Sequence, residues 1–104
     1  MAEWAFITNH GAVLALVAQH GQITAREIAT RLNITERSVH RIISDLEGAG
    51  YLERNREGRA NWYRVRHELP LRRDMRRGVA VGDLLKILTG NQFAWDWPPE
   101  SSGA

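Results

Sequence analysis

Residues 35–47, "TERSVHRIISDLE", carry the hydrophobic pattern of a helix with two chemically different sides. At ~100° per residue, the apolar positions fall on one stripe: Val39, Ile42, Ile43 and Leu46. The opposite side gathers donors and a small hydroxyl: Arg37, His40, Arg41 and Ser44. No acidic residue interrupts that side before Asp45 near its edge. The pattern predicts a helix that packs on a core with one side and offers an acid-free face with the other.

Two further helices are predicted upstream. In residues 8–21 the expected buried side consists of Val13, Leu14, Leu16 and Val17, and Gly21 is the expected stop. Residues 23–33 begin with a T-x-x-E capping box formed by Thr24 and Glu27, between the hydrophobic staple positions Ile23 and Ile28. The inward positions of this helix are Ile28, Ala29 and Leu32. Asn33 is suited to the left-handed conformation in which the chain leaves a helix.

The short connection between the second and third helices predicts a helix-turn-helix. Asn33 permits the turn, Ile34 fills the space beneath it, and Thr35 is the N-cap of the next helix. In such a pair the second helix lies in the DNA major groove. The alternative is an αα-hairpin inside a helical bundle.

After Gly48 and Gly50 the pattern changes to period two, which predicts a hairpin of "YLERNR", a turn at "EGRAN" and "WYRVR". Tyr63 and Val65 point to one side, and Gly58 supplies the permissive turn conformation. Arg56 and Arg59 bracket the tip, where a guanidinium can enter the minor groove or grip a phosphate. A basic hairpin after a helix-turn-helix is the wing of a winged helix. A hairpin that only covers the core is the alternative.

A last helix is predicted within residues 79–90, with Gly90 past its end. Its apolar positions are Val81, Leu84, Leu85 and Leu88. This face can pack on the first helix, or it can form a dimer interface, which would let two copies read two half-sites. The sequence thus predicts a winged helix domain at 4–68, an extension with a helix at 69–90, and a tail at 91–104 that contains Trp95 and Trp97 and is expected to be partly disordered.

Composition and charge fit a small cytoplasmic nucleic-acid-binding domain. The 104 residues are 43% hydrophobic and contain no cysteine, which predicts one core in a reducing compartment. No apolar run approaches the ~20 residues of a membrane span, and the first residues lack the order of a signal peptide. The net charge is only +2, but all 13 arginines lie between Arg26 and Arg77 with eight acids, a local balance of +5. This asymmetry is typical of a chain with an anionic partner, and a solvated surface rich in arginine is the alternative; charge alone does not choose between them, whereas the helix-turn-helix pattern favours the anionic partner.

Other chemistries have little support in the sequence. The four histidines never fall at the i, i+4 spacing of a helical metal pair, and no Ser/His/Asp arrangement is recognisable. We therefore expect no enzyme, no metal site and no cofactor. The sequence specifies no small-molecule effector.

Residues 4–21, 23–65 and 69–88 together resemble small prokaryotic winged helix-turn-helix transcriptional regulators of the MarR and ArsR groups. The best-matched segments are "NITERSVHRIISDLEGAGYLER" and "REGRANWYRV", and the resemblance extends over about residues 4 to 88. It implies an α+β winged helix-turn-helix fold, with a three-helix core, a two-stranded wing and a C-terminal helix. It also implies that residues 35–44 form the recognition helix and residues 54–66 the wing.

The acid-free face has the chemistry of a DNA-reading surface, because phosphates and base acceptors require donors. Glu36 is the exception: it can favour the helix dipole, pair with an arginine or accept from cytosine N4. We predict a dimeric, sequence-specific regulator of double-stranded DNA, a repressor rather than an activator because no separate activating domain is present. The alternative is a winged helix for protein–protein assembly. The predicted DNA-binding residues are Thr35, Arg37, Ser38, His40, Arg41, Ser44, Arg54, Arg56, Arg59 and Arg64; the predicted dimerisation residues are Val81, Leu84, Leu85 and Leu88.

Overall fold

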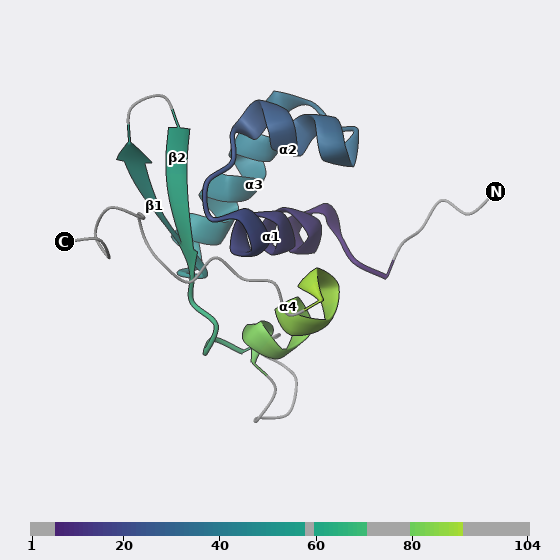
Figure 1. Cartoon of the computed structure of the whole chain (residues 1–104), viewed down its shortest axis with the longest axis vertical. Coiled ribbons are helices and arrows are strands. Elements are labelled where there is room, and N and C mark those ends of the chain that lie inside the picture. Colours follow the sequence, from purple (N-terminus) through teal and green to yellow (C-terminus); the bar gives the residue numbers. More distant parts are fainter. Residues whose placement is uncertain (1–5, 58–59, 71–79, 91–104) are drawn as a thin grey trace.

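Three helices, a hairpin and a fourth helix follow one another along the chain. The computed structural model describes residues 6–57, 60–70 and 80–90. The elements are α1 (Asn9–His20), α2 (Ala25–Leu32), α3 (Glu36–Gly48), β1 (Leu52–Glu57), β2 (Ala60–Val65) and α4 (Val81–Thr89). Figure 1 shows α1 between α2 and α4, with the hairpin at one side. This arrangement is the predicted α+β winged helix-turn-helix.

Local signals in the sequence set the ends of the first three helices. The predicted capping box is confirmed: the Thr24 hydroxyl accepts from the Glu27 N–H at 3.0 Å, and the Thr24 N–H donates to Glu27 Oε1 at 2.9 Å. The Glu27 carboxylate accepts from the Thr24 N–H and also from the Thr24 hydroxyl at 3.1 Å, and these two hydrogen bonds lower the pKa of Glu27. Asn33 has φ 56°, which confirms the left-handed exit from α2, and Gly21 has φ 73° after α1. Thr35 caps α3 by accepting from the Ser38 N–H.

One core joins α1, α2, α3, the hairpin and α4. Among the described residues, the largest fully buried side chains are Val13, Val17, Ile28, Val39, Ile43 and Leu85. The prediction for α1 was wrong in one position: Leu16 is only partly buried, whereas Ala18 is 4% exposed. Leu16 lies about 130° around the helix from the centre of the buried set, because Val13, Leu14, Val17 and Ala18 share one side.

The strands of the hairpin continue further toward its tip than the period-two pattern predicted. The antiparallel register pairs Leu52 with Val65 and continues to Glu57 opposite Ala60, so the strands include residues that were expected in the turn. Gly58 and Arg59 lie outside the described residues. Tyr63 and Val65 are buried, as their alternation predicted. The Tyr63 N–H donates to the Gly21 carbonyl oxygen at 2.7 Å, which attaches the hairpin to the end of α1.

Helix α4 is attached to the segment that leaves the hairpin. The Val81 N–H donates to the Leu69 oxygen at 2.7 Å, and the Gly82 N–H donates to the His67 oxygen at 2.9 Å. Pro70 and Ala80 form an isolated antiparallel bridge beside these bonds. Helix α4 packs against α1. Its position relative to the wing is therefore fixed by backbone contacts as well as by the core.

Substituting Gly82 should separate α4 from this segment. An added methyl group would lie 2.8 Å from His67 Cβ and 3.0 Å from its carbonyl oxygen. We expect Gly82→Ala to lower the free energy of unfolding by about 1–3 kcal/mol, as overpacking does. Gly48→Ala is the matched control, because nothing lies within 4 Å of that site and alanine favours a helix. Urea denaturation checks both variants; equal stability of the two would contradict the close packing.

Candidate nucleic-acid interface

The outer side of α3 carries the acid-free face predicted from the sequence. We call Arg37, His40, Arg41 and Ser44 the donor face. All four residues are exposed, whereas the apolar stripe of α3 is buried. Within the described ranges, no side-chain hydrogen bond or ion pair engages Arg37, His40 or Arg41. Their guanidinium and imidazole groups are available to an external partner.

The two hydroxyls at the start of α3 hold each other. Thr35 Oγ1 accepts from the Ser38 N–H at 3.0 Å and donates to Ser38 Oγ at 2.9 Å. Ser38 is half-buried, and Thr35 is exposed. Both were predicted to bind DNA, but in this structure their side chains define where the helix begins. The N-terminal end of α3 also presents backbone N–H groups and the positive end of the helix dipole.

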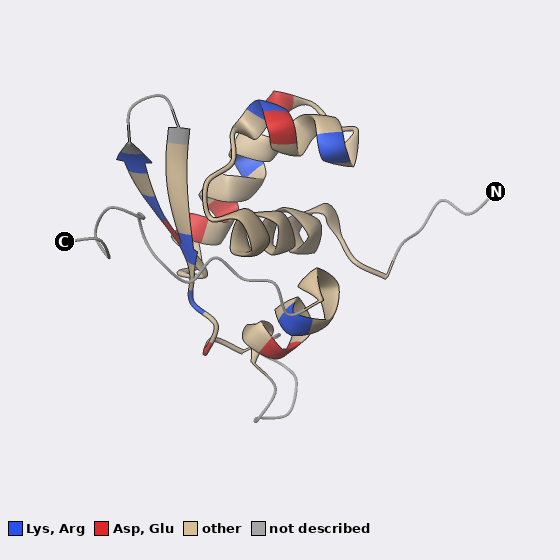
Figure 2. Ribbon diagram, in the orientation of Figure 1, with Lys and Arg blue, Asp and Glu red and all other residues tan. Residues whose placement is uncertain are grey.

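We call the hairpin of β1 and β2 the wing. A groove lies between α2, α3 and the wing. This α2–α3–wing groove has a volume of about 410 Å³. Its lining residues are Thr24, Ala25, Arg26, Glu36, His40, Arg56 and Asn61. Figure 2 shows basic positions on all three bounding elements, α2, α3 and β1. The groove brings Arg56 of the wing together with His40 of the donor face.

Sequence reasoning did not assign four of the lining residues to this interface: Thr24, Ala25, Arg26 and Asn61. Arg26 follows the capping residue of α2 by two positions, so the capping box could have indicated that it lies beside the helix N-terminus. Asn61 pairs with Arg56 in the hairpin register. The predicted turn had included Asn61, and only the longer strands place it in line with the groove.

The structure divides the predicted wing arginines into two groups. Arg54 forms an ion pair with Glu47 of α3 at 3.1 Å, and Arg64 pairs with Glu53 at 2.8 Å. Arg66 also pairs with Glu53, and hydrogen bonds from Arg64 and Arg66 lower the pKa of that carboxyl. Arg56 instead lines the groove. Arg59, the other predicted tip residue, lies outside the described residues.

The acid at the edge of the donor face is directed to α1. Asp45 Oδ2 lies 2.8 Å from His10 Nε2, across the contact between α3 and α1. The Asp45 carboxylate thus has a partner inside the protein. Its negative charge is held toward α1 rather than beside Arg41 and Ser44.

Within residues 6–57, 60–70 and 80–90, no group of three or more His, Asp or Glu side chains could hold a metal ion. None of the helices there is long and apolar enough to cross a bilayer.

Comparisons with known proteins agree with this geometry. The model of the MarR family matches residues 7–60, from the segment before α1 into β2. A solved structure, described as the zinc-dependent MarR family transcriptional regulator AdcR in the Zn(II)-bound state, is similar with a TM-score of 0.51. The two sequences are 22% identical, and the match covers 99% of this chain and 70% of that chain. No curated protein matches the sequence.

The division of the wing arginines predicts different effects on duplex binding. Arg56→Ala should weaken binding to all duplexes by similar factors and lower the salt slope, the dependence of log affinity on log salt concentration, by about one unit. Arg64→Ala should change this slope less, because Arg64 is already paired with Glu53. Titration of a fluorescent random duplex at several salt concentrations measures both. An equal loss of slope in the two variants would contradict the division.

Proposed function

Because the chain belongs to the MarR family of winged helix, DNA-binding transcriptional regulators, we propose that it is a dimeric, sequence-specific repressor. Regulators of this family bind DNA and are not enzymes. In the proposed complex, α3 lies in the major groove and the wing contacts the backbone or the minor groove. A cytoplasmic location follows from this role.

The observation that carries the proposal is the donor face of α3, which continues into the α2–α3–wing groove. Arg37 and Arg41 are one helical turn apart, both exposed, and not engaged by other described side chains. An arginine can donate two hydrogen bonds to O6 and N7 of guanine, which is worth ~1–3 kcal/mol of discrimination per base pair. Arg26 and Arg56 line the same groove as His40, where they can contact phosphates beside the base-reading residues.

Repression requires only that the protein occupy an operator that overlaps the promoter, because the bound winged helix then excludes polymerase from the shared sequence. Selection from random duplex DNA should yield a palindromic site, and transcription in vitro from a promoter containing it should fall when the protein is added. Arg41→Ala should relax the base preference at one position of each half-site and require more protein for the same repression. Increased transcription would identify an activator. Absence of salt-dependent duplex binding would favour the protein-assembly alternative.

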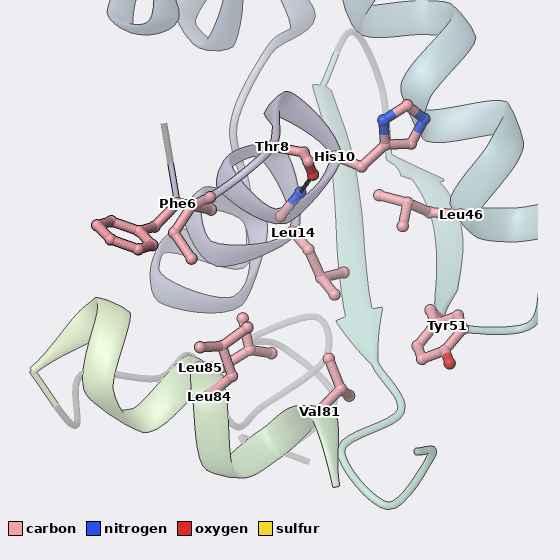
Figure 3. Close-up of a pocket in the computed structure, with 11 residues that line it drawn as sticks. Phe6, Thr8, His10, Leu14, Leu46, Tyr51, Val81, Leu84 and Leu85 are labelled. Atoms are coloured by element: carbon pink, nitrogen blue, oxygen red, sulfur yellow. Dashed lines mark hydrogen bonds between the residues drawn. The ribbon is translucent and has the colours of Figure 1, made fainter. Parts of the chain in front are cut away.

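The proposed dimer surface lies on α4 and the segment before α1. Val81 and Leu85, which the sequence offered as dimerisation residues, are 6% and 1% exposed and belong to the chain's own core. Leu84 is partly buried and lines an apolar pocket of about 480 Å³ between α1 and α4, which Phe6 borders (Figure 3). Phe6, Ile87 and Leu88 are 90%, 78% and 37% exposed. We therefore place the contact on Phe6, Leu84, Ile87 and Leu88.

Breaking this contact should give a folded monomer. Combined Ile87→Glu and Leu88→Glu substitutions put two charges on the exposed side of α4, while Leu85 keeps that helix on the core. We expect sedimentation to change from dimer to monomer, with unchanged helical circular dichroism. The variant should bind the palindrome more weakly than the parent does, because the two half-sites are then bound independently. Lys86→Glu, at an exposed position of the same helix, is the control for added negative charge. A monomeric parent protein at high concentration would contradict the dimer.

A further inference from the structure

Glu36 is the single carboxylate among the described residues that line the α2–α3–wing groove. The same groove contains two guanidinium groups, from Arg26 and Arg56, and the imidazole of His40. Glu36 is exposed, and no ion pair joins it to these or other described residues. Glu36 is therefore an acid in a groove whose basic side chains suit an anionic ligand. No described residue pairs with its carboxylate.

Glu36 is exposed at the N-terminal end of α3. It is the first residue of α3, where the positive end of the helix dipole stabilises a negative charge. Thr35 and Ser38 already satisfy each other at this end of the helix, so the Glu36 carboxylate is not used as a cap. On approach to DNA this charge is repelled by phosphates unless a donor meets it.

The major groove offers amino donors at cytosine N4 and at adenine N6, but adenine N6 lies beside the acceptor N7, which disfavours a carboxylate. Cytosine presents its N4 amino group there, and glutamate or aspartate accepts from it. N-terminal residues of a recognition helix contact base edges, whereas Arg26 and Arg56 lie on the elements that flank α3. The carboxylate can therefore reach a base while the arginines hold the backbone.

We propose that Glu36 determines specificity by accepting a hydrogen bond from a cytosine N4 amino group and by repelling duplexes that lack cytosine at that position. This assignment rests on the proposed function and names one of its base contacts. The same residue thereby weakens binding to random DNA and strengthens the preference for the operator. Its effect is a difference between sequences, not a gain in affinity for every duplex.

Two substitutions test this assignment in the full-length protein. Selected sites of the parent should show a C·G pair at one position in each half-site, preferred about five- to tenfold over the other pairs. Glu36→Ala should lose this preference. Glu36→Gln should admit adenine at the same position, because glutamine bonds N6 and N7 of adenine. Both variants should bind a random duplex several-fold more tightly than the parent at low salt.

Glu68→Gln is the matched control, because it removes one exposed carboxylate that does not line the groove. It should leave both the base preference and random-duplex affinity unchanged. If Glu36→Gln and Glu36→Ala keep every base preference of the parent, the assignment is overturned while the proposed function stands. If Glu68→Gln strengthens random binding as much as Glu36→Gln does, the effect is one of net charge and the assignment is again overturned. A parent that binds no duplex overturns the proposed function as well.

Discussion

The burial of the α3 apolar stripe against α1 and α2 is the interaction on which the rest of the structure depends. Val39 and Ile43 are essentially inaccessible, and Ile42 and Leu46 are buried beside them. A rotation of α3 by one residue, about 100°, would carry arginines toward the core and expose the stripe. The donor face is thus oriented by hydrophobic packing on the opposite side of the helix. Asn33 supports this packing because it turns the chain between α2 and α3 at a positive φ, which asparagine tolerates better than most residues.

Electrostatic partners inside the molecule refine the surface that packing creates. Glu47, Glu53 and Asp45 each engage a basic side chain at the margin of the proposed interface. Such exposed pairs contribute little to stability. They do decide which arginines remain available to an external partner. Among the described residues, arginines without an acidic partner remain on α3 and in the α2–α3–wing groove. The total charge of a segment therefore overstates the charge that it can offer a partner.

The success of sequence reasoning follows the range of the interactions involved. The capping box, the Asn33 turn and the α3 stripe depend on residues within one or two turns of each other, and these predictions were confirmed. The groove depends on how far the hairpin register continues, which brings Asn61 beside Arg56 and opposite α2. The Arg54–Glu47 pair likewise joins two elements. The apolar pattern of α4 fitted a core and a dimer contact equally, because periodicity shows that a face is apolar but not what covers it. Only its packing on α1 assigns Val81 and Leu85 to the core.

The bridge between Pro70 and Ala80 has a consequence for how this chain can change length. Residues 69, 70, 80 and 81 are joined by that bridge and by the Val81–Leu69 hydrogen bond, so residues 70 and 80 lie side by side. The entropic cost of closing a loop rises only slowly with the number of residues that it contains, by about 0.6 kcal/mol for each doubling. Insertions and deletions between these anchors can therefore accumulate in evolution without displacing α4. The same position is a natural place to graft an affinity tag or a fluorescent domain into the chain.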